Sequence, residues 1–85
     1  MPLNQKDRDF LQTFKDDVFF TRDKNGRLFM SITIPTINES LGEWENDAKN
    51  QDNAFFELDK EMLKAVTWES GKAWTPQELL AEAGQ

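Results

Sequence analysis

Length, composition and charge indicate one small acidic domain and exclude most catalytic chemistry. The 85 residues are 38% hydrophobic and 12% aromatic and carry a formal net charge of −6, values that fit a single folded domain over residues 1–85. Because the chain has no Cys and no His, it lacks thiol nucleophiles, disulfides, imidazole bases and zinc-finger sites. We therefore expect no enzyme, no catalytic residue, no cofactor and no dedicated metal site.

The distribution of apolar residues gives no sign of a membrane segment. No apolar run exceeds three residues, whereas a membrane-spanning helix needs about 20. The first residues, Met1 to Asp7, contain no apolar signal-peptide core. These features predict a cytoplasmic protein that does not bind membranes.

Residues 4–16 have the pattern of an amphipathic helix. Apolar side chains recur at helical spacing at Phe10, Leu11 and Phe14. Asn4 is a favourable N-cap, and Asp7 places negative charge in the first turn, where the helix dipole favours it. We expect this helix to bury its apolar stripe and to keep its charged face in water.

Residues 18–34 predict a β-hairpin with its turn at Asp23-Lys24-Asn25-Gly26. Two registers compete. A two-residue Asn25-Gly26 turn would pair Phe19 with Ile32. A type I turn followed by a bulge at Gly26 would pair Asp23 with Arg27. We prefer the second register because it gathers more apolar side chains on one face of the hairpin.

The preferred register has a consequence for two aromatic residues. One face collects Val18, Phe20, Leu28, Met30 and Ile32. The opposite face then carries Phe19 and Phe29, which need cover from a helix or from a partner. Both are therefore candidates for a partner-binding surface.

Two apolar patterns predict helices in the second half of the chain. After Pro35, apolar residues recur at helical spacing at Ile37, Leu41, Trp44 and Ala48. Gly42 lies inside this pattern, where Gly costs about 1 kcal/mol relative to Ala. A second helix is predicted over 57–67 from Leu58, Met62 and Val66. Residues 54–58 fit either a third strand or the first turn of that helix, and both alternatives stay open.

The segment Thr75-Pro76-Gln77-Glu78 is the strongest local signal in the chain. Thr75 is an N-cap, Pro76 fits the first helical position, and Glu78 completes a capping box. A last helix is predicted over residues 76–83. The complete prediction is an α+β fold in the order α-β-β-α-α-α, with an antiparallel hairpin of two or three strands packed against three to four helices.

Residues 37–59 carry the whole net charge. One basic and seven acidic residues give this segment a formal charge of −6, and the rest of the chain sums to zero. In the predicted helix, Glu39, Glu43 and Asp47 would share one face. The candidate partner-binding carboxylates are Glu39, Glu43, Glu45, Asp47 and Asp52.

This charge pattern favours a non-enzymatic protein-interaction module, although a merely solvated acidic face explains the same residues. Since the chain has no cluster of Lys and Arg, we expect no direct nucleic acid binding. The expected partner is a larger protein with a basic surface, which the chain would regulate or inhibit. One alternative is a nucleic-acid-mimicking inhibitor of a DNA- or RNA-binding protein, of the kind that phages and mobile elements encode. Another is a structural or assembly subunit that uses exposed aromatics. The oligomeric state stays open.

Overall fold

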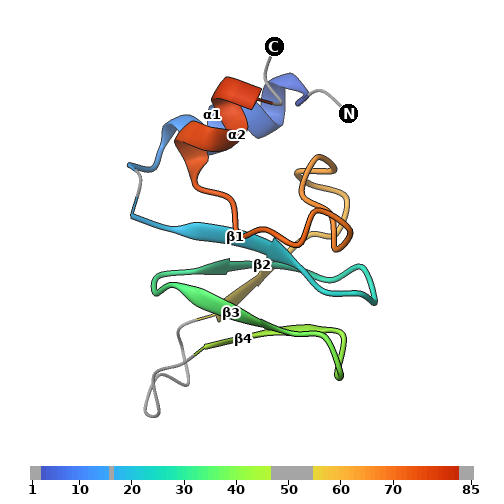
Figure 1. Ribbon diagram of the computed structural model, residues 1–85. Helices are drawn as coiled ribbons and strands as arrows, with labels where there is room; N and C mark the ends of the chain where they lie inside the picture. The colour runs from blue at the N-terminus through green and yellow to red at the C-terminus, as the bar shows by residue number, and fades with distance from the viewer. Residues whose placement is uncertain (1–2, 16, 47–54, 83–85) are drawn as a thin grey trace.

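The structure, a computed structural model, describes residues 3–15, 17–46 and 55–82. It confirms the α+β class, but the predicted order α-β-β-α-α-α and the three to four helices are wrong. Within the described residues, two short helices enclose five strands in sequence (Figure 1). The elements are α1 Gln5–Gln12, β1 Phe19–Arg22, β2 Leu28–Ser31, β3 Pro35–Asn38, β4 Glu43–Asn46, β5 Phe55–Leu58 and α2 Pro76–Glu82.

The strands form two antiparallel sheets. The larger sheet has the order β1-β2-β5, and β3 pairs with β4 in a separate hairpin. Figure 1 shows both helices at one end of the molecule and the β3–β4 hairpin at the other. The outer side of β1 is closed by Trp74, whose N–H and C=O both bond to the backbone of Phe20, at 2.9 and 2.7 Å.

The first helix begins where the sequence predicts. The Asn4 side chain accepts a hydrogen bond from the Asp7 N–H at 2.8 Å, and the Asp7 carboxylate accepts from the Asn4 N–H at 3.4 Å. This reciprocal capping satisfies two backbone donors that a helix start leaves free. The helix ends at Gln12, earlier than predicted, and residue 16 lies outside the described residues.

The β1–β2 hairpin has the preferred register. The N–H of Asp23 donates to Arg27 O at 2.9 Å, and the Gly26 N–H donates to Asp23 O at 2.9 Å. Phe20 then lies opposite Met30, as the bulged turn requires. Gly26 has a φ of +94°, which an L-residue with a side chain rarely adopts. Strand β2 ends at Ser31, whereas the predicted hairpin extends to residue 34.

The predicted helix through Ile37, Leu41 and Trp44 is wrong, because this region forms the β3–β4 hairpin; Ala48 lies outside the described residues. Gly42 is the physical reason. Its φ is +70°, and its C=O accepts a hydrogen bond from the Lys24 N–H at 2.9 Å. A Cβ on Gly42 would lie 3.0 Å from Lys24 Cβ, so this glycine permits both a turn and a close backbone approach.

The predicted helix over 57–67 is also wrong. Residues Phe55–Leu58 form β5, which resolves the open alternative in favour of a third strand, and the residues that follow form turns. Leu63 has a φ of +47°, a left-handed conformation that no α-helix contains. The carbonyls that helical N–H groups would use accept instead from the Arg22 guanidinium.

Arg22 ties this turn segment to the β1–β2 hairpin. Its five N–H groups donate to five backbone carbonyls at 2.6–3.2 Å, those of Gly26, Lys60, Met62, Leu63 and Val66. Burial lowers the pKa of the Arg22 guanidinium, and the nearby Glu61 opposes that shift. The planar fork therefore replaces the regular backbone bonding that a helix would supply.

The core lies between the larger sheet, the two helices and the turn segment. Its fully buried side chains include Phe20 from β1, Leu11 from α1 and Leu79 from α2. The predicted capping box of α2 is confirmed, since Thr75 N–H donates to Glu78 Oε1 at 3.0 Å and Glu78 N–H donates to Thr75 Oγ1 at 3.2 Å. The larger sheet, the two helices and the turn segment therefore contribute apolar side chains to one contiguous cluster.

Substitution of Gly26 tests the hairpin turn. Gly26→Ala should lower the free energy of unfolding by about 1–2 kcal/mol in denaturant titrations, because φ > 0 is strained for Ala. No heavy atom lies within 4 Å of the added Cβ, so a steric clash contributes nothing. Gly26→Asn should recover part of the loss, since Asn tolerates positive φ better. Equal stabilities of wild type and Gly26→Ala would contradict this turn.

Substitution of Arg22 tests the carbonyl cluster. Arg22→Lys should lower the free energy of unfolding by about 3 kcal/mol or more, because an ammonium group cannot reach five carbonyls and leaves several of them unsatisfied. Arg27→Lys is the matched control, since the Arg27 side chain is exposed and its guanidinium donates to the carboxylate of Glu57 rather than to a cluster of backbone carbonyls. Comparable losses in the two variants would refute the special role of Arg22.

Candidate interaction surface

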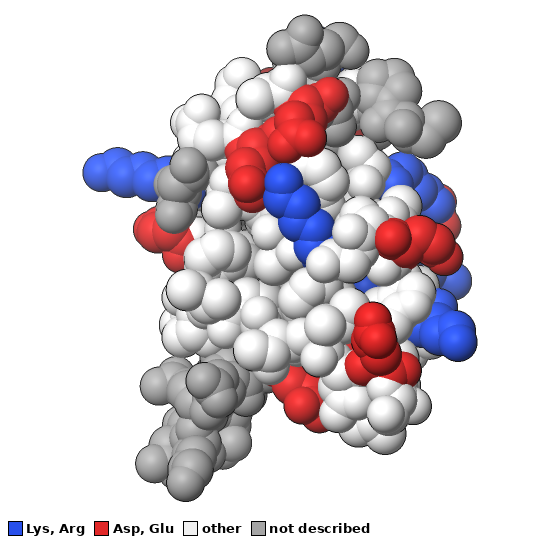
Figure 2. Space-filling model, in the orientation of Figure 1, with Lys and Arg blue, Asp and Glu red and all other residues white. Residues whose placement is uncertain are grey.

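The β3–β4 hairpin carries the described part of the acidic segment. Glu39 lies in its turn, Glu43 and Glu45 lie on β4, and all three are exposed. Because alternate residues of a strand point to the same side, Glu43 and Glu45 share one face. On the face shown in Figure 2, acidic side chains lie at the lower end, where this hairpin lies, and another group lies at the upper end beside a basic side chain. We call the hairpin with these three residues the acidic hairpin.

The arrangement differs from the predicted one. A helix face would have joined Glu39, Glu43 and Asp47, but the structure joins Glu43 and Glu45 on a strand and puts Glu39 in the turn. Asp47 and Asp52 lie outside the described residues. A strand spaces same-face carboxylates by two residues rather than four, so the charge is concentrated on a shorter element.

Two apolar side chains on the acidic hairpin are exposed. Leu41 at the turn is 63% exposed and Ile37 on β3 is 37% exposed. Ile37 lies opposite Trp44, which is half-buried, on the face of the hairpin away from Glu43 and Glu45. The hairpin therefore offers charge and apolar area close together, a combination found at protein interfaces.

Phe19 and Phe29, the aromatic candidates, are half-buried rather than free. The ring of Phe29 packs edge-on against Phe55 with centroids 6.0 Å apart, and the Arg27 guanidinium lies 5.5 Å from the Phe29 centroid. On the same sheet face, Thr21 is fully buried. Strand β4 lies against β1, so part of the cover predicted from a helix or a partner comes from the hairpin.

Asp23 joins the acidic hairpin to the larger sheet. It is 7% exposed, and its Oδ1 accepts a hydrogen bond from the Trp44 N–H at 2.9 Å. Burial raises the pKa of the Asp23 carboxyl; the Trp44 N–H lowers it, and the charge of Glu43 raises it further. This carboxylate and the Lys24 N–H bond to Gly42 hold the hairpin at two points.

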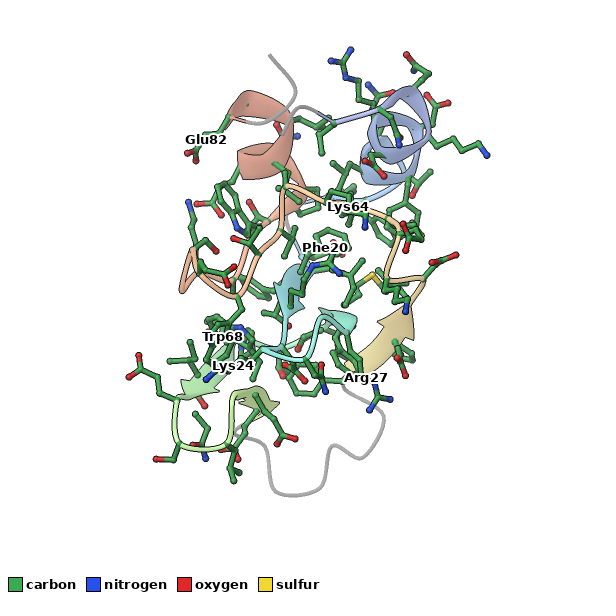
Figure 3. The ribbon with its side chains drawn as sticks, turned by 90° about the vertical axis from the view of Figure 1, so that its right-hand side faces the viewer. Phe20, Lys24, Arg27, Lys64, Trp68 and Glu82 are labelled. Atoms are coloured by element: carbon green, nitrogen blue, oxygen red, sulfur yellow. The ribbon has the colours of Figure 1, made fainter. Side chains whose placement is uncertain are left out.

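A groove borders the acidic hairpin. Its two hollows, of about 480 and 370 Å³, share Lys24, Trp68 and Glu69 in their walls. Lys24 and Trp68 lie near each other beside the hairpin, and Lys64 lies further along (Figure 3). Lys64 pairs with Glu61 at 3.1 Å, and Arg22 donates to carbonyls, so the groove walls carry opposing charges.

The sequence prediction missed this groove because its walls come from segments 22–26, 37–39 and 60–71. The sequence prediction placed residues 57–67 in a helix, which would not bring them to these other segments. A usable signal was the pair of hydrophobic residues Trp68 and Ile37 in otherwise polar surroundings. Only the tertiary structure brings them to one groove.

Across residues 3–15, 17–46 and 55–82, no group of three or more acidic side chains is placed to hold a metal ion. No helix among these residues is long and apolar enough to cross a membrane.

Comparison with known proteins adds no assignment: no family model, curated protein or solved structure matches this chain.

The pH dependence of stability tests the buried Asp23 carboxylate. Since its pKa is raised in the folded state, the folded protein binds the proton more tightly than the unfolded chain, and ionisation costs stability as pH rises through that interval. Asp23→Asn keeps an acceptor for the Trp44 N–H without the buried charge. The free energy of unfolding of Asp23→Asn minus that of wild type should therefore be larger at pH 7 than at pH 3.

Thermal melts of both proteins from pH 3 to pH 7 measure this difference. Asp17→Asn, which removes an exposed carboxylate, is the control. A stability difference between Asp23→Asn and wild type that does not change with pH would contradict a raised pKa for Asp23.

Proposed function

We propose that this protein is a non-enzymatic interaction module whose acidic hairpin docks on a basic surface of a larger protein. The observation that carries the proposal is the hairpin itself. Its described residues include three exposed glutamates, Glu39, Glu43 and Glu45, and no Lys or Arg. The turn between its strands carries the exposed Leu41. Regulation or inhibition of the partner is the activity that such docking supports.

The two kinds of side chain on the hairpin have different roles in this proposal. Exposed carboxylates attract a basic surface over several ångströms and raise the association rate. Leu41, at the turn, supplies apolar area that leaves water on contact, which slows release. The hydrogen bonds through Asp23 and Gly42 fix the hairpin before binding, so little ordering entropy is lost.

A more specific form of this proposal is nucleic-acid mimicry. Glu43 and Glu45 on one face of a strand place two negative charges in a row, and such a row can enter a groove that normally holds a phosphate backbone. A DNA- or RNA-binding protein is then the partner, and competition with its nucleic acid is the distinguishing readout. A variant with Glu43→Lys and Glu45→Lys must no longer compete with the nucleic acid.

Charge reversal tests the proposed function. The chain is immobilised, the proteins it captures from the lysate of its own organism are identified, and the captured protein is purified. Glu43→Lys with Glu45→Lys should then weaken binding at least about tenfold, mainly by lowering the association rate. The effect should shrink as ionic strength rises. Surface plasmon resonance at two salt concentrations measures both rate constants.

The matched control reverses two carboxylates outside the acidic hairpin. Asp9→Lys with Asp17→Lys changes the net charge equally, and both residues are exposed. Binding should survive in this variant almost unchanged. If the control loses as much affinity as the hairpin variant, net charge rather than the acidic hairpin drives binding. If neither variant loses affinity, the proposal is wrong.

A further inference from the structure

Strand β5 is an edge of the larger sheet, and its outer side pairs with no strand in the described part of the chain. The geometry points to this edge as the place where two copies of the protein pair, β5 against β5, in antiparallel orientation. The second copy is the occupant because the edge is complementary to itself, as the backbone pattern and the register indicate. In Figure 3, β5 is the gold arrow on the right, near Arg27.

The ladder fixes which backbone groups of β5 point outward. Phe20 bonds to Trp74 through both its N–H and its C=O, so these groups point away from β2. Hydrogen-bonded and non-hydrogen-bonded pairs alternate in an antiparallel ladder. Met30, opposite Phe20 and Phe56, must therefore bond toward β5. It follows that Phe56 bonds inward and that the N–H and C=O groups of Phe55 and Glu57 point outward.

The β5 edge lacks three features that often keep strand edges apart. Natural edges carry lysines, prolines, bulges or a covering segment, and β1 has such cover in Trp74. Phe55–Leu58 contains none of the three residue features, and its one charge, Glu57, is neutralised by a two-point contact with Arg27 at 2.6 and 2.9 Å. Phe56 is 43% exposed, so apolar area lies at the same edge.

Self-pairing selects one register. If the twofold axis passes through Phe56, this residue lies opposite its copy, and Phe55 of each chain exchanges hydrogen bonds with Glu57 of the other. The two Phe56 rings then meet on one face as a non-hydrogen-bonded pair, the closer kind of cross-strand pair. A shift to an axis through Glu57 would place two carboxylates opposite each other, which is unfavourable.

Pairing of two copies at β5 uses no residue of the acidic hairpin, and the effect of salt distinguishes this pairing from docking of the hairpin. Each copy carries a net charge of −6, so the copies repel each other and added salt should strengthen their association. Docking of the acidic hairpin on a basic partner should weaken with salt. Because a four-residue edge is short, we expect a weak dimer that forms only at high protein concentration.

Analytical ultracentrifugation of the full chain over a concentration series tests the dimer. Wild type should show a monomer–dimer equilibrium that shifts toward dimer in high salt. Phe56→Lys should raise the dissociation constant at least about tenfold. Ile34→Lys is the matched control, because Ile34 is 71% exposed and lies outside the strands; it should dimerise like wild type. A wild type that stays monomeric at millimolar concentration would overturn the inference.

A second variant guards against a folding defect in Phe56→Lys and tests the register. The chain has no Cys, so single cysteines report contacts cleanly. Phe56→Cys on the twofold axis should form an intermolecular disulfide under mild oxidation, since a non-hydrogen-bonded pair has Cα atoms about 4.5 Å apart. Leu41→Cys, at an exposed hairpin turn, should cross-link much more slowly. Equal cross-linking of the two variants would overturn the β5 pairing.

Discussion

The Arg22 guanidinium is the contact on which the rest of the structure depends. It donates to carbonyls of the β1–β2 turn and of residues 60–66, two parts of the chain about 40 positions apart. A turn segment without regular hydrogen bonds has carbonyls that need donors when buried. Arginine supplies five from one rigid plane, whereas a lysine would supply three from a point. The segment can therefore stay irregular and still be buried.

Leu63 shows what this anchoring makes possible. Its left-handed backbone costs roughly 1–2 kcal/mol, yet its side chain is fully buried in the core. Its C=O accepts from Arg22 and its N–H donates to the Asp7 carboxylate at 3.1 Å. The carboxylate that caps α1 thus also holds the turn segment. Removal of either charged group would take a hydrogen bond from this strained residue.

The fold could be predicted from the sequence where the signal is local. The caps at Asn4 and Thr75 and the turn at Gly26 depend on residues within four positions of each other, and all three are confirmed. The helices expected over 37–48 and 57–67 failed because distant groups decide those regions. The Lys24 N–H donates a hydrogen bond to the Gly42 C=O, and the Arg22 guanidinium donates to backbone carbonyls of the second segment. No periodicity in a single sequence reveals such long-range donors.

The candidate site divides in the same way. Composition alone identified Glu39, Glu43 and Glu45 as exposed charges, because a solvated carboxylate needs no partner, but their arrangement depended on whether the element was a helix or a strand. Phe56 was missed because residues 54–58 were ambiguous, and an edge strand is recognised only once its neighbours are known.

The acidic hairpin and the β5 edge belong to different sheets, so the two proposed contacts do not compete for the same residues. A pair of copies joined at β5 would present two acidic hairpins to one partner or to two. Linking two weak sites raises their combined affinity without any new contact, provided that the geometry lets both engage. Weak self-association would then make docking steeply dependent on protein concentration. A small domain would thereby gain avidity that one hairpin alone does not supply.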